Sequence, residues 1–278
     1  MNPLATPADG VDLVRWAHLA GLQALPTFGA LLALMLAAAC AVWTLGRQGS
    51  RARPSALRLG AGLGTIVVGS AVFAALATGV FAADGKHTLA LADQALADAI
   101  RLSVPPAAVQ TFALLTRLGD TLTLTILCLV VALALSIHGR RGLAFAWVFA
   151  VAGNGLLNAG LKQVFGRARP LREAGWVSEP GFSFPSGHSS GAVVAFGMLA
   201  YLALRLLPPR WHLPAVLLAL TLAFSVAASR LFLRVHFGSD VLAGIASGSA
   251  WLALCIVGIE RAPGWRWPAG AATVAGRR

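Results

Sequence analysis

His236 and Asp240 are the pair of residues whose spacing most directly suggests chemistry. They are four residues apart, so both side chains share one face if a helix begins near His236. The carboxylate can then hold one imidazole nitrogen protonated while the other nitrogen stays available to attack an electrophile. A second histidine, His188, can serve as an acid for the leaving oxygen. The pattern predicts an activated nucleophile with a proton donor.

Clustered cations and a serine–glycine turn predict that the electrophile is a phosphate group. Two cationic clusters follow separate apolar runs: Lys162, Arg167, Arg169 and Arg172, then Arg230 and Arg234. Between them, Pro185-Ser186-Gly187 precedes a third apolar run and supplies backbone amides at a helix N-terminus, which bind anions. Arginine adds bidentate geometry toward phosphate. For Arg167, Arg172 and Arg234 individually, a solvated or lipid-facing position is the favoured interpretation.

The elements that must position these residues are membrane spans. Of the 278 residues, 58% are apolar and 12% are charged, and the mean hydropathy is +0.76, which excludes an ordinary soluble domain. The net charge of +12 could suggest a nucleic-acid partner, but the basic residues are distributed between long apolar runs rather than along one face. We therefore expect bilayer lipids and no nucleic acid as partners.

Seven apolar runs have the length of a transmembrane helix, about 20 residues. They are Leu25–Leu45, Leu59–Ala83, Gly119–Ile137, Gly142–Leu161, Gly187–Leu207, Leu213–Ser229 and Phe237–Ile259. The sequence thus predicts an all-α fold, a polytopic membrane helix bundle of about seven spans. The alternative is a peripheral first run and six spans.

Basic residues gather in alternate loops, which predicts the orientation. One set of loops holds Arg47, Arg51, Arg53, Arg58, Arg140, Arg141, Arg205, Arg210, Arg261, Arg266, Arg277 and Arg278, with Glu260 as its only acid. We expect that side to be cytoplasmic and the N-terminus to be external. The longest external connection, Asp84 to Leu115, has apolar positions at helical spacing and predicts an amphipathic helix on the membrane that ends at Pro105-Pro106.

Three motifs in order resemble the type 2 phosphatidic acid phosphatase family. They are Lys162, six residues and Arg169-Pro170; Pro185-Ser186-Gly187-His188; and Ser229-Arg230, five residues, His236, three residues and Asp240. All three lie where an expected span reaches the same side of the membrane, which makes a chance match improbable. The resemblance covers roughly residues 59–260 and implies a six-helix phosphatase core, preceded by residues 1–58 with an extra span and followed by a basic tail, 261–278.

The resemblance also implies roles for individual residues. His236 would form a phosphohistidine, Asp240 would orient it, and His188 would protonate the leaving group and later activate water. The phosphoryl oxygens would be held by Lys162, Arg169, Ser186, Gly187 and Arg230. We expect no cofactor and no metal, because the outer carboxylates Glu173, Glu179 and Asp240 are dispersed among cations that would repel a divalent ion.

A phosphate site at a bilayer edge predicts an amphiphilic substrate, a membrane lipid phosphate. Family members accept undecaprenyl diphosphate, diacylglycerol diphosphate, phosphatidylglycerol phosphate and phosphatidic acid, and we favour polyprenyl diphosphate, with phosphatidylglycerol phosphate next. The expected location is the bacterial inner membrane, with the site facing the periplasm or exterior; no oligomeric state is predicted. A phosphotransferase with the same site is one alternative, and a lipid or anion transporter is another.

Outside the motifs, one polar stripe and four histidines remain. Asn154, Asn158 and Lys162 are spaced by four on the fourth span, which predicts either hydrogen bonds between helices or a device that aims Lys162. No chemical role is expected for the histidines that stand apart from other reactive groups: His18, His87, His138 and His212.

Overall fold

The structure, a computed structural model, describes residues 7–48, 55–81, 88–170 and 181–262. All regular elements in these ranges are helices, which confirms the predicted all-α class. They are α1 (Pro7–Leu22), α2 (Ala24–Gln48), α3 (Ser55–Val80), α4 (Thr88–Ser103), α5 (Pro106–Leu115), the 3-10 turn η1 (Thr116–Gly119), α6 (Thr121–Ile137), α7 (Arg141–Phe165), α8 (Gly187–Leu206), the 3-10 turn η2 (Pro209–Trp211), α9 (His212–Phe232) and α10 (Gly238–Arg261).

Six helices in the described ranges are long and apolar enough to cross a membrane: α2, α3, α7, α8, α9 and α10. The predicted third span corresponds to α6, which has only 17 residues. Together with the preceding segment Pro106–Gly119 it passes the same test, with a 43° bend between the two parts. The predicted count of seven is therefore reached when this bent pair forms one span.

The end of α7 differs from the sequence prediction in a way that matters for the site. The apolar run ends at Leu161, whereas α7 continues to Phe165. Gly166 ends the helix in a left-handed conformation with φ 58°, and its N–H donates to the carbonyl oxygen of Lys162. Lys162 therefore lies in the last helical turn, on the same helix as Asn154 and Asn158 as their spacing predicts.

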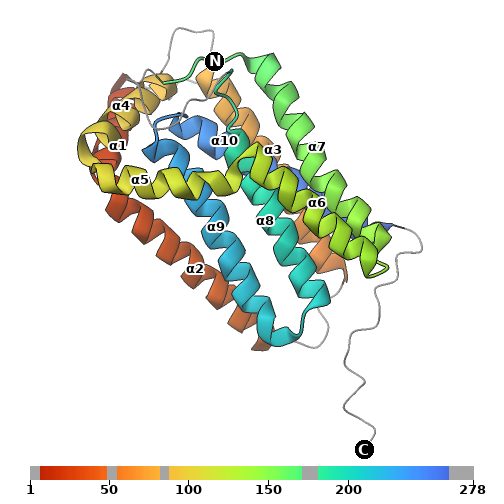
Figure 1. Ribbon diagram of the computed structural model, residues 1–278. Coiled ribbons are helices and arrows are strands. Elements are labelled where there is room, and N and C mark those ends of the chain that lie inside the picture. Colours follow the sequence, from red (N-terminus) through yellow and green to blue (C-terminus); the bar gives the residue numbers. More distant parts are fainter. Residues whose placement is uncertain (1–6, 49–54, 82–87, 171–180, 263–278) are drawn as a thin grey trace, which may run out of the picture.

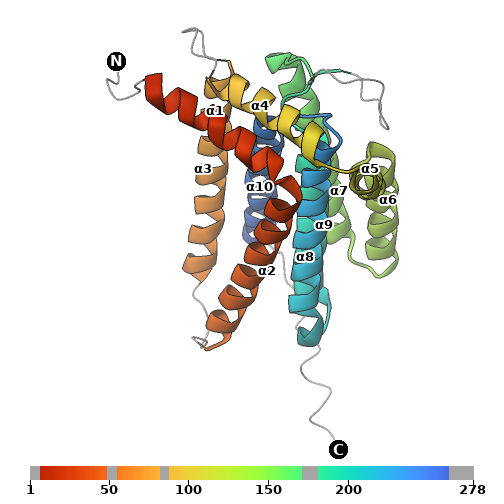
Figure 2. The same cartoon turned by 90° about the vertical axis from the view of Figure 1, so that its left-hand side faces the viewer.

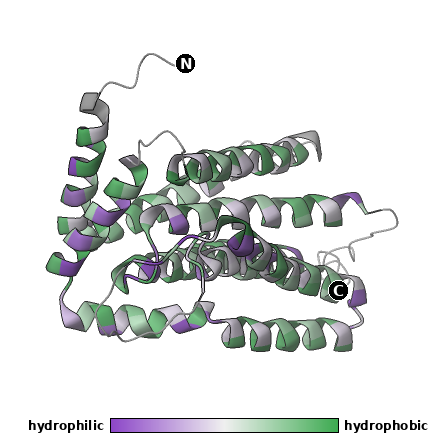
Figure 3. Cartoon of the chain, turned by 90° about the horizontal axis from the view of Figure 1, so that it is seen from above, coloured by the Kyte–Doolittle hydropathy of each residue, from purple (hydrophilic) through white to green (hydrophobic). Residues whose placement is uncertain are grey.

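The long helices run side by side (Figures 1 and 2). The C-termini of α7 and α9 and the N-termini of α8 and α10 lie at the same end, and α1 and α4 lie across it (Figure 2). Viewed from that end, the hydrophilic residues gather on the short crossing helices and the central loops, while the long helices are mainly hydrophobic (Figure 3). The topology thus brings the three motifs to one end of the bundle.

The predicted amphipathic helix is present as α4, but its apolar face packs against protein. Ala92, Asp93, Ala99 and Ile100 on this face are buried. Its main partner is α1, which the sequence analysis did not predict, and the two helices pack so closely that a Cβ on Gly21 would lie 2.5 Å from the Cβ of Ala99. Because α1 gains its stability from this tertiary contact, its own apolar pattern is a weak signal.

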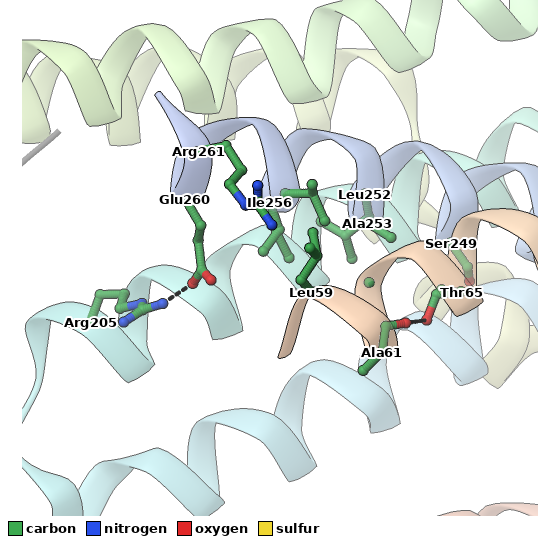
Figure 4. A pocket seen from close by; sticks show the side chains of 12 residues that line it. Leu59, Ala61, Thr65, Arg205, Ser249, Leu252, Ala253, Ile256, Glu260 and Arg261 are labelled. Atoms are coloured by element: carbon green, nitrogen blue, oxygen red, sulfur yellow. Dashed lines mark hydrogen bonds and ion pairs between the residues drawn. The ribbon is translucent and has the colours of Figure 1, made fainter. Parts of the chain in front are cut away.

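A cavity of about 570 Å³ lies at the opposite end of the bundle (Figure 4). Its walls are the first turns of α3 and the last turns of α8 and α10, where Arg205 pairs with Glu260. The cavity and the three motifs therefore occupy different ends of the protein.

Candidate active site

His236 lies in the short connection between α9 and α10 and is 2% exposed. Its Nδ1 is 3.3 Å from the Oγ of Ser183 and 3.5 Å from Oδ2 of Asp240. The predicted adjacency of His236 and Asp240 is present, but the Ser183 hydroxyl also lies against both groups and donates to Asp240. Asp240 is fully buried in the first turn of α10.

The contacts of the imidazole define its tautomer. A guanidinium nitrogen of Arg169 lies 3.2 Å from Nε2, and because arginine can only donate, Nε2 accepts. The proton of the neutral ring is therefore on Nδ1, which faces Ser183 and Asp240. Burial lowers the pKa of His236 more than any other influence does. Asp240 raises the pKa, Arg230 and Arg169 lower it, and the pKa is about 4. At neutral pH the ring is uncharged and Nε2 carries a lone pair.

Each oxygen of Asp240 has fixed partners. Oδ2 accepts from Ser183 and, at 2.8 Å, from the backbone N–H of Phe237, which closes the first turn of α10. Oδ1 accepts from Arg167 at 2.6 Å. A carboxylate held on both oxygens has a defined plane, so the imidazole beside it is held in orientation as well.

Arg167 corrects one sequence expectation. A solvated or lipid-facing position is wrong for this residue, because its side chain is 10% exposed and bridges two carboxylates. One guanidinium nitrogen donates to Asp240, and the other donates to Asp93 of α4 at 2.8 Å. Two buried carboxylates are unfavourable unless a cation lies between them. Arg167 is therefore buried, although arginine side chains usually extend to water.

The second motif forms the N-terminus of α8. The Ser186 side chain is the N-cap and accepts from the backbone N–H of Ser189, while its own backbone N–H donates to the carbonyl oxygen of Asp240 at 3.0 Å. Gly187 leaves no space for a side chain, since a Cβ there would lie 2.9 Å from Oδ1 of Asn158. The second and third motifs are therefore joined through backbone atoms.

His188 follows directly in the first turn of α8. Its Nε2 lies 2.8 Å from Oδ1 of Asp120, at the N-cap of α6, and its ring is 13% exposed. This contact fixes the orientation of the ring and links the α5–α6 corner to the site. The second histidine, like the first, has a carboxylate partner.

The remaining motif cations lie at the same end. Arg230 is fully buried near the end of α9, and its guanidinium donates to the hydroxyl of Thr116 in η1. Lys162 lies one turn beyond Asn158 on α7. Asn154 and Asn158 are buried and both donate to the Oγ of Ser190, at 3.3 and 3.4 Å, so this stripe makes the predicted hydrogen bonds between helices.

Among the residues of this cluster that were not singled out from the sequence are Asp93, Asp120 and Ser183. The position of Asp93 could have been noticed in the sequence. It falls four residues after Leu89 and seven before Ile100, on the apolar stripe of α4. An acid on a buried stripe requires a partner. For Asp120 and Ser183 the contacts depend on tertiary structure, and their local sequence gives no comparable signal.

The other predicted positions are placed as follows. Arg234 is half-buried after α9 with φ 54°, and Arg172 and His87 lie outside the described residues. His138 and His212 bond to backbone carbonyl oxygens near them in the chain, and His18 is exposed. Within the described ranges, no three His, Cys, Asp or Glu residues are grouped so that they could hold a metal ion.

Comparisons with known proteins identify relatives of this chain. The family profile described as the PAP2 superfamily matches residues 143–263. The chain is 33% identical to phosphatidylglycerophosphatase B of Bacillus subtilis, over 58% of this chain and 81% of that protein. It is also 33% identical to a lipid A 1-phosphatase of Rhizobium johnstonii, over 51% of this chain and 63% of that protein.

A solved structure shows the same fold. The crystal structure of a transmembrane PAP2-type phosphatidylglycerolphosphate phosphatase from Bacillus subtilis superposes with a TM-score of 0.67 at 27% identity. The superposition covers 73% of this chain and 99% of that chain. Sequence similarity and shared fold lead to one conclusion: this chain belongs to the PAP2 superfamily.

Proposed function

We propose that this protein is an integral membrane phosphatase that hydrolyses the phosphate or diphosphate head groups of lipids. The observation that carries the proposal is the buried, neutral His236, whose Nδ1 faces Ser183 and Asp240 and whose Nε2 faces Arg169. A lone pair beside a fixed cation is the arrangement that attack on a phosphoryl group needs. The relatives, named as phosphatases of phospholipid and lipid A, support a lipid substrate.

The proposed reaction has two steps. Nε2 of His236 attacks phosphorus, an N–P bond forms, and the bond to the lipid oxygen breaks. In the proposed first step, protonated His188, whose Nε2 lies 2.8 Å from Oδ1 of Asp120, gives a proton to the leaving oxygen. Water then attacks phosphorus, the N–P bond breaks, and His188 recovers its proton from the water. Inorganic phosphate leaves and His236 is neutral again.

The phosphoryl oxygens would be held by groups that are already in place. On substrate binding, the Arg169 N–H that now points at Nε2 would turn to a phosphoryl oxygen and release the lone pair. Lys162 and Arg230 would add charge, and Ser186 and Gly187 lie at the N-terminus of α8, where backbone amides favour an anion. Phosphoryl transfer depends mainly on positioning and charge stabilisation, which this set supplies.

The substrate and location follow from the position of the site at the end of a membrane bundle. A head group at the bilayer edge can reach the site while its lipid tails remain in the membrane. The arginine-rich loops at the opposite end of the bundle support a site on the periplasmic or external face of a bacterial inner membrane. Phosphatidylglycerol phosphate, undecaprenyl diphosphate and phosphatidic acid are the substrates to compare.

Metal independence is tested by measuring phosphate release from these three lipids in detergent with excess EDTA. We expect release to continue, because arginine, lysine and histidine side chains stabilise the negative charge of the phosphoryl group in place of a metal ion. Release that stops with EDTA and returns with a divalent cation would contradict the mechanism. Chromatography of the lipid products would show whether phosphate passes to another lipid instead of water, as in a phosphotransferase.

Replacing His188 by alanine should affect monoesters more than diphosphates. A monoester expels an alkoxide that needs a proton, whereas a diphosphate expels a phosphate group, a far better leaving group. We expect kcat to fall by about 10²–10⁴-fold on phosphatidic acid and by less on undecaprenyl diphosphate. Equal losses on both substrates, measured by steady-state phosphate release, would show that His188 does not act as the acid in the first step.

A further inference from the structure

Arg167 is one of the six unspecified residues between Lys162 and Arg169 of the first motif, yet it makes several contacts around Asp240. One guanidinium nitrogen donates to Oδ1 of Asp240 at 2.6 Å and to the Oγ of Ser239 at 2.7 Å. The guanidinium carbon lies 4.4 Å from the centroid of the Phe237 ring, at the N-cap of α10. Arg167 therefore holds the first turn of α10 from three sides.

Asp93 completes the arrangement from a different part of the chain. Its Oδ2 accepts from Arg167 at 2.8 Å and from the Ser239 hydroxyl, and its Oδ1 accepts from the Ser239 backbone N–H at 2.9 Å. Asp93 is 4% exposed and lies on α4, outside residues 143–263 that the family profile covers. A helix that crosses the end of the bundle thus reaches the carboxylate that faces His236.

Arg167, Asp93 and Asp240 interact through their charges as well as through packing. Asp93 and Asp240 are both buried, and a buried carboxylate without a cation is strongly unfavourable. The guanidinium lies between them and presents two nitrogens in one plane, a geometry that lysine cannot reproduce. The plane of Asp240, and through it the direction of the His236 Nδ1 proton, depends on where Asp93 holds Arg167.

We propose that Arg167, anchored by Asp93 of α4, is a positioning residue that sets the orientation and charge of Asp240 and thereby the reactivity of His236. The inference rests on the proposed function, because it assigns Arg167 to the same reaction. Arg167 touches neither the substrate nor the reacting atoms in this role. It acts through Asp240 alone.

The test compares Arg167→Gln, Arg167→Lys and Asp93→Asn with two control variants of exposed residues on α4, Asp98→Asn and Arg101→Gln. We expect Arg167→Gln to lower kcat by about 10- to 100-fold with little change in KM. Arg167→Lys should recover part of this loss, Asp93→Asn should show a smaller loss, and both controls should match the wild type. If Arg167→Gln does not fold, Asp93→Asn and Arg167→Lys still decide the question.

A purely structural role is excluded by two further readouts. In an Asp240→Asn background, Arg167→Gln should cause no additional loss, because its effect passes through Asp240. The imidazole of His236, followed by NMR, should titrate at higher pH in Arg167→Gln. The reason is that Asp240 then acts on the ring with less compensation, while Arg169 and Arg230 stay unchanged.

Three outcomes would overturn the inference: wild-type kcat in Arg167→Gln, additive losses in the double variant, or an unchanged titration of His236. The titration needs no turnover. It therefore decides the inference even if the wild type releases no phosphate, a result that would instead contradict the proposed function.

Discussion

The His236→Ala variant is expected to lose phosphate release on every lipid tested, with kcat lower by about 10⁶-fold, as when the nucleophile of another hydrolase is removed. No other described residue offers an accepting nitrogen in the same position: Nε2 of His236 faces Arg169, and the ring is buried. His138→Ala is the matched control, since His138 is exposed and bonds to a backbone carbonyl oxygen of its own helix. This control should retain wild-type activity.

The pH dependence gives a second view of the same residue. Because the pKa of His236 is lowered to about 4, the ring stays neutral through the weakly acidic range. The acid limb of kcat/KM that His236 contributes should therefore lie near pH 4, well below that of an ordinary histidine, and activity should be lost as the pH falls through it. An acid limb near pH 6.5 in the wild-type profile, with none near pH 4, would contradict the buried, neutral state of His236.

The Asp240→Asn variant should show the second-largest effect, a loss of about 10⁴-fold in kcat, the size seen when the orienting aspartate of a catalytic triad becomes an amide. The carboxylate accepts on both oxygens, from Arg167 on one side and from Ser183 and the Phe237 N–H on the other. An amide nitrogen cannot accept a hydrogen bond. The variant therefore loses the hydrogen bonds on one side of the group and holds the imidazole in the wrong tautomer.

Steady-state kinetics distinguish this effect from weaker substrate binding. We expect kcat to fall while KM changes little, because Asp240 acts on the nucleophile and not on the lipid. Asp98→Asn, an exposed position on α4, serves as a control for the same chemical change. Thermal unfolding identifies variants that fail to fold. A loss below about 10-fold in a folded protein would mean that Asp240 does not orient His236.

The sequence predicted the helices better than the contacts between them. Apolar runs of span length gave the spans α2, α3 and α7 to α10, because hydrophobic length is a local property. The adjacency of His236 and Asp240 followed from a spacing of four at a helix start. In contrast, α1 was missed because its stability depends on packing against α4.

The surroundings of the site could not be derived from local patterns. Arg167 pairs with Asp93 from 74 residues away, and His188 pairs with Asp120 from 68 residues away. Only the folded bundle brings these residues together, so a buried arginine and an exposed one look the same in the sequence. The position of Asp93 on an apolar stripe was the one clue that a buried ion pair was present.

The most direct test of the central claim is to trap the phosphorylated protein. Lipid labelled in the terminal phosphate is mixed with the purified protein in excess EDTA, quenched in alkali within one turnover, and the labelled peptide is identified by mass spectrometry. The account predicts an acid-labile, alkali-stable phosphoryl group on His236, absent in His236→Ala and lasting longer in His188→Ala. Turnover without a labelled protein, or label on a residue other than His236, would contradict it.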